Sequence, residues 1–158
     1  MTGPTVAIED LPAFVGRNQR LIGIDLGTKT IGLALSDVER RLATPFETIR
    51  RVKFTKDVEV LRGILDRFDV AALVVGLPLN MDGTEGPRVQ STRAFVRQSA
   101  PLLGRPAVFW DERLSTAAVT RSLIAQNASR ARREAVVDRM AAAYILQGAL
   151  DRLSALMG

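Results

Sequence analysis

The stretch that decides the fold spans residues 21–37 and reads LIGIDLGTKTIGLALSD. Two apolar runs, each with the length of a short strand, flank a turn at 27–30, and this pattern predicts a β-hairpin. The first strand carries a carboxylate, Asp25, among apolar neighbours, where an ionised group is unfavourable unless cations or hydrogen-bond donors compensate it. From these residues alone two explanations stay open: an aspartate satisfied by the amides of the turn, or an aspartate kept for chemistry.

The composition of the chain narrows the chemistry that it can perform. Its 158 residues include no cysteine and no histidine. These absences exclude disulfides, thiolate zinc sites, imidazole metal ligands and both Ser-His-Asp and Cys-His catalysis. An enzyme of this composition would depend on carboxylates, lysine, hydroxyls or a metal held by oxygen atoms. The net charge of +5 favours a polyanionic partner, most often nucleic acid, over a merely basic surface.

Length and hydropathy predict one domain and no membrane partner. No apolar run is long enough to span a bilayer, and the N-terminus lacks the basic-then-apolar pattern of a signal peptide, so the sequence predicts a cytoplasmic protein. Residues 1–19 have the composition of a flexible N-terminal extension that contributes little to the fold. Residues 20–158 are then predicted to form a single domain.

The pattern of apolar residues predicts the order of the elements. Strands are expected at 20–26, 31–37, 42–49, 70–76 and 107–110, and helices at 54–68, 88–100, 114–126 and 134–156. The third strand should lie at a sheet edge, because Pro45 cannot donate to a central ladder. Three leading strands followed by alternation predict an α/β fold: a mixed five-stranded sheet flanked by helices, in the order of the ribonuclease H-like architecture.

Three acids stand where a charge is unfavourable. Asp25 lies on the first strand, Glu112 just after the last strand, and Asp138 on an apolar face of the last helix. For a single such residue, a salt bridge to a nearby arginine would be the first explanation. Three of them, in a chain without histidine or cysteine, favour ligation of a hard cation such as Mg²⁺ or Mn²⁺, which prefers oxygen ligands.

Short motifs in the same order give a specific resemblance. They are GIDLGTK at 23–29, IGLA at 31–34, VGLPLNMDG at 75–83, DERLST at 111–116, VDRMAA at 137–142 and ILQ at 145–147. With these motifs the chain resembles the YqgF/RuvX family, whose members are described as Holliday junction resolvases and as pre-16S rRNA nucleases. The resemblance implies a ribonuclease H-like nuclease that uses Mg²⁺ or Mn²⁺. It places the catalytic, metal-binding acids on Asp25, Glu112 and Asp138.

The chain departs from the family pattern in two places. The family commonly has a second basic residue after the position of Lys29, and this chain has Thr30 there, which leaves any phosphate contact at the turn to Lys29. The residues before position 21 match nothing in the pattern. Two further acids are ambiguous: Asp82 is expected to cap its own turn rather than to be a fourth ligand, and Glu112 is favoured over its neighbour Asp111.

Basic residues near the last helix indicate how nucleic acid could bind. Arginines gather in sequence before position 134, where the alternative is a solvated charge run. Phosphate contact is favoured because the predicted basic loop at 127–133 adjoins Asp138. The predicted nucleic-acid contacts are Lys29, Arg113, Arg130, Arg132 and Arg133. The partner would be branched DNA or structured precursor rRNA, and the sequence does not choose between them.

Two rival functions and one open question remain at this stage. A domain that binds nucleic acid without cutting it would tolerate the loss of all three acids. The DLGTK turn at 25–29 also resembles the phosphate-binding hairpin of actin-like ATPases, but that class needs two such domains around the nucleotide. The oligomeric state is open, because symmetrical cleavage of a four-way junction would require a homodimer and no exposed apolar stripe indicates one.

Overall fold

The computed structural model describes residues 5–114 and 130–157, with the side chains of the last helix described from 137 to 156. Five strands form one mixed sheet in the order β3-β2-β1-β4-β5. The strands are β1 (Arg20–Leu26), β2 (Thr30–Ser36), β3 (Ala43–Arg50), β4 (Val70–Leu77) and β5 (Ala107–Asp111). β1, β2 and β3 are antiparallel neighbours, whereas β4 and β5 run parallel to β1. The predicted mixed five-stranded sheet is thus confirmed.

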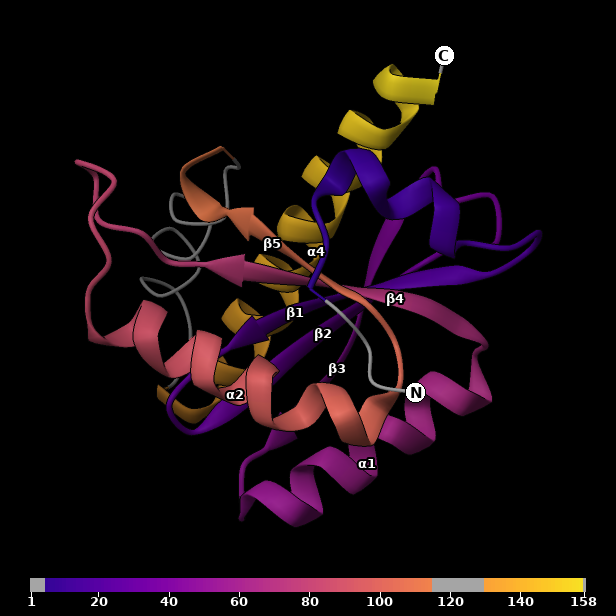
Figure 1. The fold of residues 1–158 in the computed structure, drawn as a ribbon. Helices are drawn as coiled ribbons and strands as arrows, with labels where there is room; N and C mark the ends of the chain where they lie inside the picture. Colours follow the sequence, from indigo (N-terminus) through magenta and orange to yellow (C-terminus); the bar gives the residue numbers. More distant parts are fainter. Residues whose placement is uncertain (1–4, 115–129, 158) are drawn as a thin grey trace.

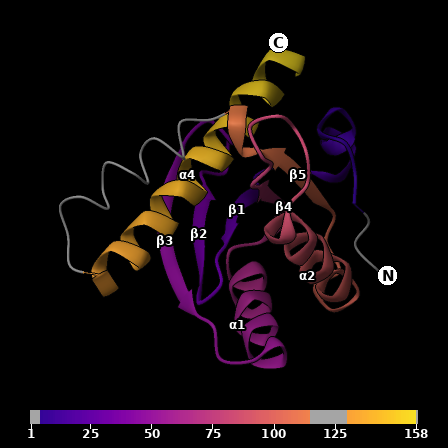
Figure 2. The same cartoon turned by 90° about the vertical axis from the view of Figure 1, so that its left-hand side faces the viewer.

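Helices cover both faces of the sheet (Figure 1). α1 (Phe54–Arg67) and α2 (Pro87–Leu103) lie on one face, and α4 (Arg130–Met157) lies on the other, as Figure 2 shows. Two hydrophobic clusters correspond to these layers, one between the sheet and α1 and α2, the other between the sheet and α4. Within the described residues, no helix combines the length and the apolar character that a bilayer crossing requires.

The hairpin that was predicted from residues 21–37 forms the centre of the sheet. β1 pairs with β2 on one side and with β4 on the other, and the side chains of both hairpin strands are almost entirely buried. β3 is an edge strand, as Pro45 indicated, and a register irregularity falls between Leu33 and Ala34, opposite that proline. Strands buried on both faces read as continuous apolar runs, which explains why β4 was recognisable from sequence.

The described part of the N-terminal segment contributes more to the fold than the sequence predicted. A 3-10 helix, η1 (Ile8–Phe14), packs beside α4, and Leu11 is fully buried in the α4-side cluster. The backbone N–H of Val6 donates to the carbonyl oxygen of Ala107 at 2.9 Å, beside a bridge from Thr5 to β5. These contacts attach to the sheet and to α4 a segment whose composition resembles that of a loop.

Helix boundaries also depart from the prediction in two places. α2 begins at Pro87, a residue that suits the first position of a helix, and continues past Pro101 to end before Gly104, whose φ is +66°. α4 begins at Arg130, so the predicted basic loop at 127–133 is helical from that residue onward. The predicted helix at 114–126 lies outside the described residues except for Leu114, which ends the 3-10 turn η2 (Glu112–Leu114).

Candidate active site

Asp25 points toward the α4 face of the sheet. Side chains alternate along a strand, and on β1 Leu21 packs in the α4-side cluster while Ile24 packs in the opposite one. Gly23 is on the same face as Leu21, because a Cβ atom added there would lie 2.7 Å from Cβ of Leu146 on α4. Asp25 continues this alternation, close to the C-terminal end of β1, and it is only 2% exposed. Its carboxylate is therefore held beneath α4 and not in solvent.

Two glycines flank Asp25 on the neighbouring strands and make room for the other two acids. Gly32 is paired directly with Asp25 on β2, and the β1–β4 register brings Gly76 beside Asp25 on the other side. A Cβ atom on Gly32 would lie 2.7 Å from Cβ of Asp138, and one on Gly76 would lie 3.1 Å from Cγ of Glu112. Asp138 and Glu112 therefore occupy the spaces that larger side chains would fill on either side of Asp25.

The three predicted acids are neighbours, but they do not form one tight cluster. Adjacent strands are about 4.8 Å apart, so the backbones of Gly32 and Gly76 are separated by roughly 10 Å, with Asp25 between them. Among the described residues, no three His, Cys, Asp or Glu side chains are grouped so that they could hold a metal ion. Glu112 is buried, at 6% exposure, whereas Asp138 is partly exposed. The arrangement is a row of carboxylates centred on Asp25.

The carboxylate of Asp138 is oriented by Thr30, the residue that replaces the second basic residue of the family pattern. The Thr30 hydroxyl donates a hydrogen bond to Oδ2 of Asp138, and Thr30 itself is buried. The carbonyl oxygen of Thr30 in turn accepts the N–H of Gly27 at 2.8 Å, which closes the β1–β2 turn. The hairpin turn and the last helix are thus coupled through one hydroxyl group, a contact that the sequence analysis did not predict.

The carboxylates of Asp111 and Asp82 accept hydrogen bonds from residues close to them in sequence. Arg113 donates to both carboxylate oxygens of Asp111, at 2.7 Å from Nη2 and 3.1 Å from Nε, and this lowers the pKa of Asp111. Asp82 accepts the hydroxyl and the backbone N–H of Thr84, and these hydrogen bonds lower the pKa of Asp82. The expectation that Asp82 caps its own turn is confirmed.

The predicted nucleic-acid contacts are only partly within the described structure. Lys29 is exposed at the β1–β2 turn, beside the row of acids. Arg113 is exposed and, besides its pair with Asp111, donates from Nη1 to the carbonyl oxygen of Met81 at 3.2 Å. Arg130, Arg132 and Arg133 form the beginning of α4, and their side chains lie outside the described residues.

Two arginines near the turn were missed by the sequence analysis. Arg51 donates from Nη1 to the carbonyl oxygen of Gly27 at 2.7 Å, and Arg88 donates from Nη2 to the carbonyl oxygen of Leu26 at 3.2 Å. Both contacts join residues that are distant in sequence, so no local pattern indicates them. Arg88 could have been noticed, because a cation in the first turn of a helix is disfavoured by the helix dipole.

The order of the strands and the helices on both faces define a ribonuclease H-like domain. A solved structure with the same fold, T. thermophilus RuvC in complex with a Holliday junction substrate, aligns with a TM-score of 0.53 and 17% identity, over 86% of this chain and 96% of that one. At this low identity, the likeness shows the fold alone.

Sequence comparison identifies the family. The profile of the RuvX family, described as "Holliday junction resolvase", matches residues 19–152. A protein of Beijerinckia indica subsp. indica named "Putative pre-16S rRNA nuclease" is 68% identical over 154 residues, which cover 98% of this chain and 93% of that protein. A protein of the same name from Methylocella silvestris is 67% identical over 97% of this chain and 95% of its own length. The chain belongs to the RuvX family.

Proposed function

We propose that this protein is a divalent-metal-dependent endonuclease that hydrolyses phosphodiester bonds in structured nucleic acid. The observation that carries the proposal is the row of buried or partly buried carboxylates centred on Asp25, contributed by β1, η2 and α4. Two glycines make the space that Glu112 and Asp138 occupy in this row. A chain without histidine or cysteine has few other ways to activate water.

The donor set fits Mg²⁺ or Mn²⁺, which prefer carboxylate oxygens and retain several waters. Asp25 and Glu112 would hold such ions, and Asp138 would complete the site through Oδ1, since Oδ2 accepts the Thr30 hydroxyl. A divalent ion supplies an activated water and positive charge at the leaving oxygen. Metal binding would have to draw the carboxylates closer together than they lie here, because the described residues contain no ready three-acid group.

Precursor 16S rRNA is the favoured substrate, because the relatives that are 67–68% identical to this chain carry that name. Branched DNA is the second candidate, because the family is described as a Holliday junction resolvase. Lys29, Arg113, Arg130, Arg132 and Arg133 would contact phosphates of either substrate without reading its sequence. We expect the protein in the cytoplasm, and a homodimer only if it cleaves four-way junctions symmetrically.

The test uses the full-length protein with end-labelled precursor rRNA and with a labelled four-way junction, each in Mg²⁺, in Mn²⁺ and in EDTA. We expect metal-dependent cuts in the RNA at defined positions. Cleavage of the junction alone, with paired symmetrical cuts, would favour the second substrate, and sedimentation should then show a dimer. Binding without cleavage in either metal would refute the nuclease and leave the non-cleaving binding domain.

A further inference from the structure

A cavity lies at the same edge of the sheet as the row of acids, but on the opposite side of the β1–β2 turn. It has a volume of about 240 Å³, and its walls come from the turn and from the beginning of α2. The polar residues of the walls include Thr28, Arg51, Arg88 and Ser91. Leu26, which also lines it, packs in the cluster on the α1 and α2 face. The cavity and the carboxylate row are therefore separated by the turn itself.

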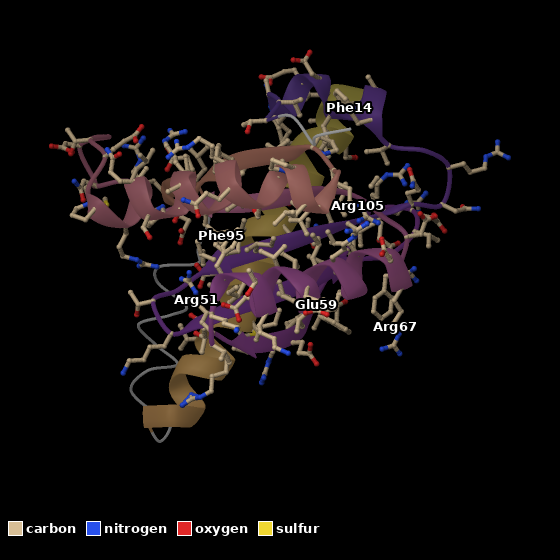
Figure 3. All side chains as sticks on the ribbon, turned by 60° about the horizontal axis from the view of Figure 1, so that its bottom comes forward. Phe14, Arg51, Glu59, Arg67, Phe95 and Arg105 are labelled. Carbon is tan, nitrogen blue, oxygen red and sulfur yellow. The ribbon has the colours of Figure 1, made fainter. Side chains whose placement is uncertain are left out.

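Both guanidinium groups in the cavity are held in place by the backbone of the turn. Arg51 donates to the carbonyl oxygen of Gly27, and its Cζ lies 5.5 Å from the centre of the Phe95 ring. Figure 3 shows Arg51 and Phe95 between α1 and α2. Arg88 donates to the carbonyl oxygen of Leu26. A guanidinium has five N–H donors, so these contacts orient each side chain and leave donors for a ligand.

Among the residues that the structure describes, no carboxylate forms an ion pair with the arginines of this cavity. Some arginines of the described chain have carboxylate partners, for example Arg93, which pairs with Glu85 at 2.9 Å, and Arg105, which pairs with Asp66 at 2.7 Å. None of the ion pairs formed between described residues includes Arg51 or Arg88, and no acidic residue is among those lining the cavity. An anion bound between two like charges offsets their mutual repulsion.

We propose that this cavity binds a backbone phosphate of the nucleic-acid substrate, a few nucleotides from the phosphate at Asp25. The proposal rests on the proposed function, because the nuclease site at Asp25 defines where the cut strand lies. A strand crossing the β1–β2 turn would place one phosphate over the carboxylates and another between Arg51 and Arg88. Bidentate contact of guanidinium with phosphate is a common and geometrically specific interaction. The class of ligand is therefore a phosphodiester of a polynucleotide.

The rival explanation is that the two arginines only fasten the turn. That role would need the two hydrogen bonds to the carbonyl oxygens, but it would not need an open cavity. A charge introduced on the α2 wall of the cavity would then have no effect on RNA binding. Ser91 provides the means to separate the two roles, because it lines the cavity and is exposed on α2. A carboxylate placed there would repel a bound phosphate, whereas an amide of the same size would not.

The experiment measures equilibrium binding of a labelled structured RNA in EDTA, so that cleavage is not needed. Ser91→Asp is compared with the size-matched Ser91→Asn, and Arg88→Gln with Arg62→Gln, a control on the exposed face of α1. Between about 50 and 200 mM salt, Arg88→Gln should reduce the log–log slope by about one, since each lost phosphate contact removes about 0.9. Ser91→Asp should bind roughly tenfold more weakly than Ser91→Asn, a change of about 1.4 kcal/mol.

Two outcomes would overturn one proposal or the other. If Ser91→Asp and Ser91→Asn bind alike, and Arg88→Gln keeps the slope of Arg62→Gln, the cavity does not bind phosphate and the arginines only fasten the turn. Thermal melts of all four variants show whether a change in slope reflects unfolding. If the expected slopes appear but the wild type cuts nothing in Mg²⁺ or Mn²⁺, the phosphate site stands and the nuclease proposal fails.

Discussion

Gly32 lies directly beneath Asp138: a Cβ atom on Gly32 would be 2.7 Å from Cβ of Asp138 and 2.1 Å from its carbonyl oxygen. Such separations are too short for any side chain, so α4 can lie this close to β2 only above a glycine. The same glycine is the cross-strand partner of Asp25. The distance between two proposed catalytic acids is therefore fixed by a residue that has no side chain.

We expect Gly32→Ala to destabilise the protein and to abolish cleavage, because α4 must move away from β2. Overpacking of this kind costs typically about 1–3 kcal/mol in the free energy of unfolding. Urea denaturation measures this loss directly. Gly63→Ala, on α1, is the control: a Cβ atom there meets nothing within 4 Å, and alanine in a helix should add about 0.5–1 kcal/mol. Equal stability of the Gly32 variant and the wild type would show that α4 does not pack as described.

Thr30 is expected to act as a positioning residue through its hydrogen bond to Oδ2 of Asp138. Thr30→Val keeps the shape and loses the hydroxyl, and we expect kcat/KM for cleavage to fall by about 10- to 100-fold, as for other residues that orient metal ligands. The metal concentration for half-maximal activity should rise, and RNA binding in EDTA should stay the same. Thr30→Ser retains the hydroxyl and should recover most of the activity. A serine variant as inactive as the valine variant would show that the hydroxyl alone is not sufficient and that the γ-methyl group is also required.

Asp25→Asn, Glu112→Gln and Asp138→Asn should each abolish cleavage and leave nucleic-acid binding largely intact, since we propose that arginines carry the binding and metal-binding acids the chemistry. Thermal melts provide a readout that needs no substrate. Mg²⁺ or Mn²⁺ should raise the melting temperature of the wild type through binding to the folded state. The same ions should raise the melting temperature of Asp25→Asn much less. Equal metal-induced shifts in both proteins, or substantial activity in the Asp25 variant, would remove Asp25 from the set of ligands.

The elements that local patterns specify were predicted well from the sequence. The central hairpin at 20–37 and the buried strand β4 are continuous apolar runs, and their bounds agree with the structure to within a residue. Asp25 and Glu112 could be singled out as candidate site residues because acids rarely lie within or directly beside such runs. Asp138 was recognisable because it interrupts an apolar helical face.

What the sequence did not reveal depends on contacts between distant residues. Leu11 is buried because η1 reaches α4, and nothing in the composition of 1–19 indicates that packing. Thr30 and Asp138 are 108 residues apart, and Arg88 and Leu26 are 62 apart. Such pairs follow from the sheet order, which has to be known before either partner can be named.

The ion pair between Asp111 and Arg113 should make a small, pH-dependent contribution to stability. The hydrogen bonds from Arg113 lower the pKa of Asp111 in the folded state, whereas the unfolded value is about 3.9. A group with a lowered pKa in the folded state stabilises the protein above the unfolded pKa, and this contribution disappears as the pH falls through the folded value. Asp111→Asn should therefore be less stable than the wild type at pH 7 and equally stable in strong acid.

Chemical denaturation of the wild type and of Asp111→Asn, from neutral to acidic pH, measures the difference in their stability. At neutral pH this difference should become smaller at high salt, because the Asp111–Arg113 ion pair is partly exposed. Glu59→Gln, a charge removal on the exposed face of α1, is the control for a general effect of net charge. Since Arg113 also donates to the carbonyl oxygen of Met81, loss of the pair should loosen the loop after β4. A gap between wild type and Asp111→Asn that persists unchanged into acid would show that Asp111 stabilises the fold by some means other than its charge.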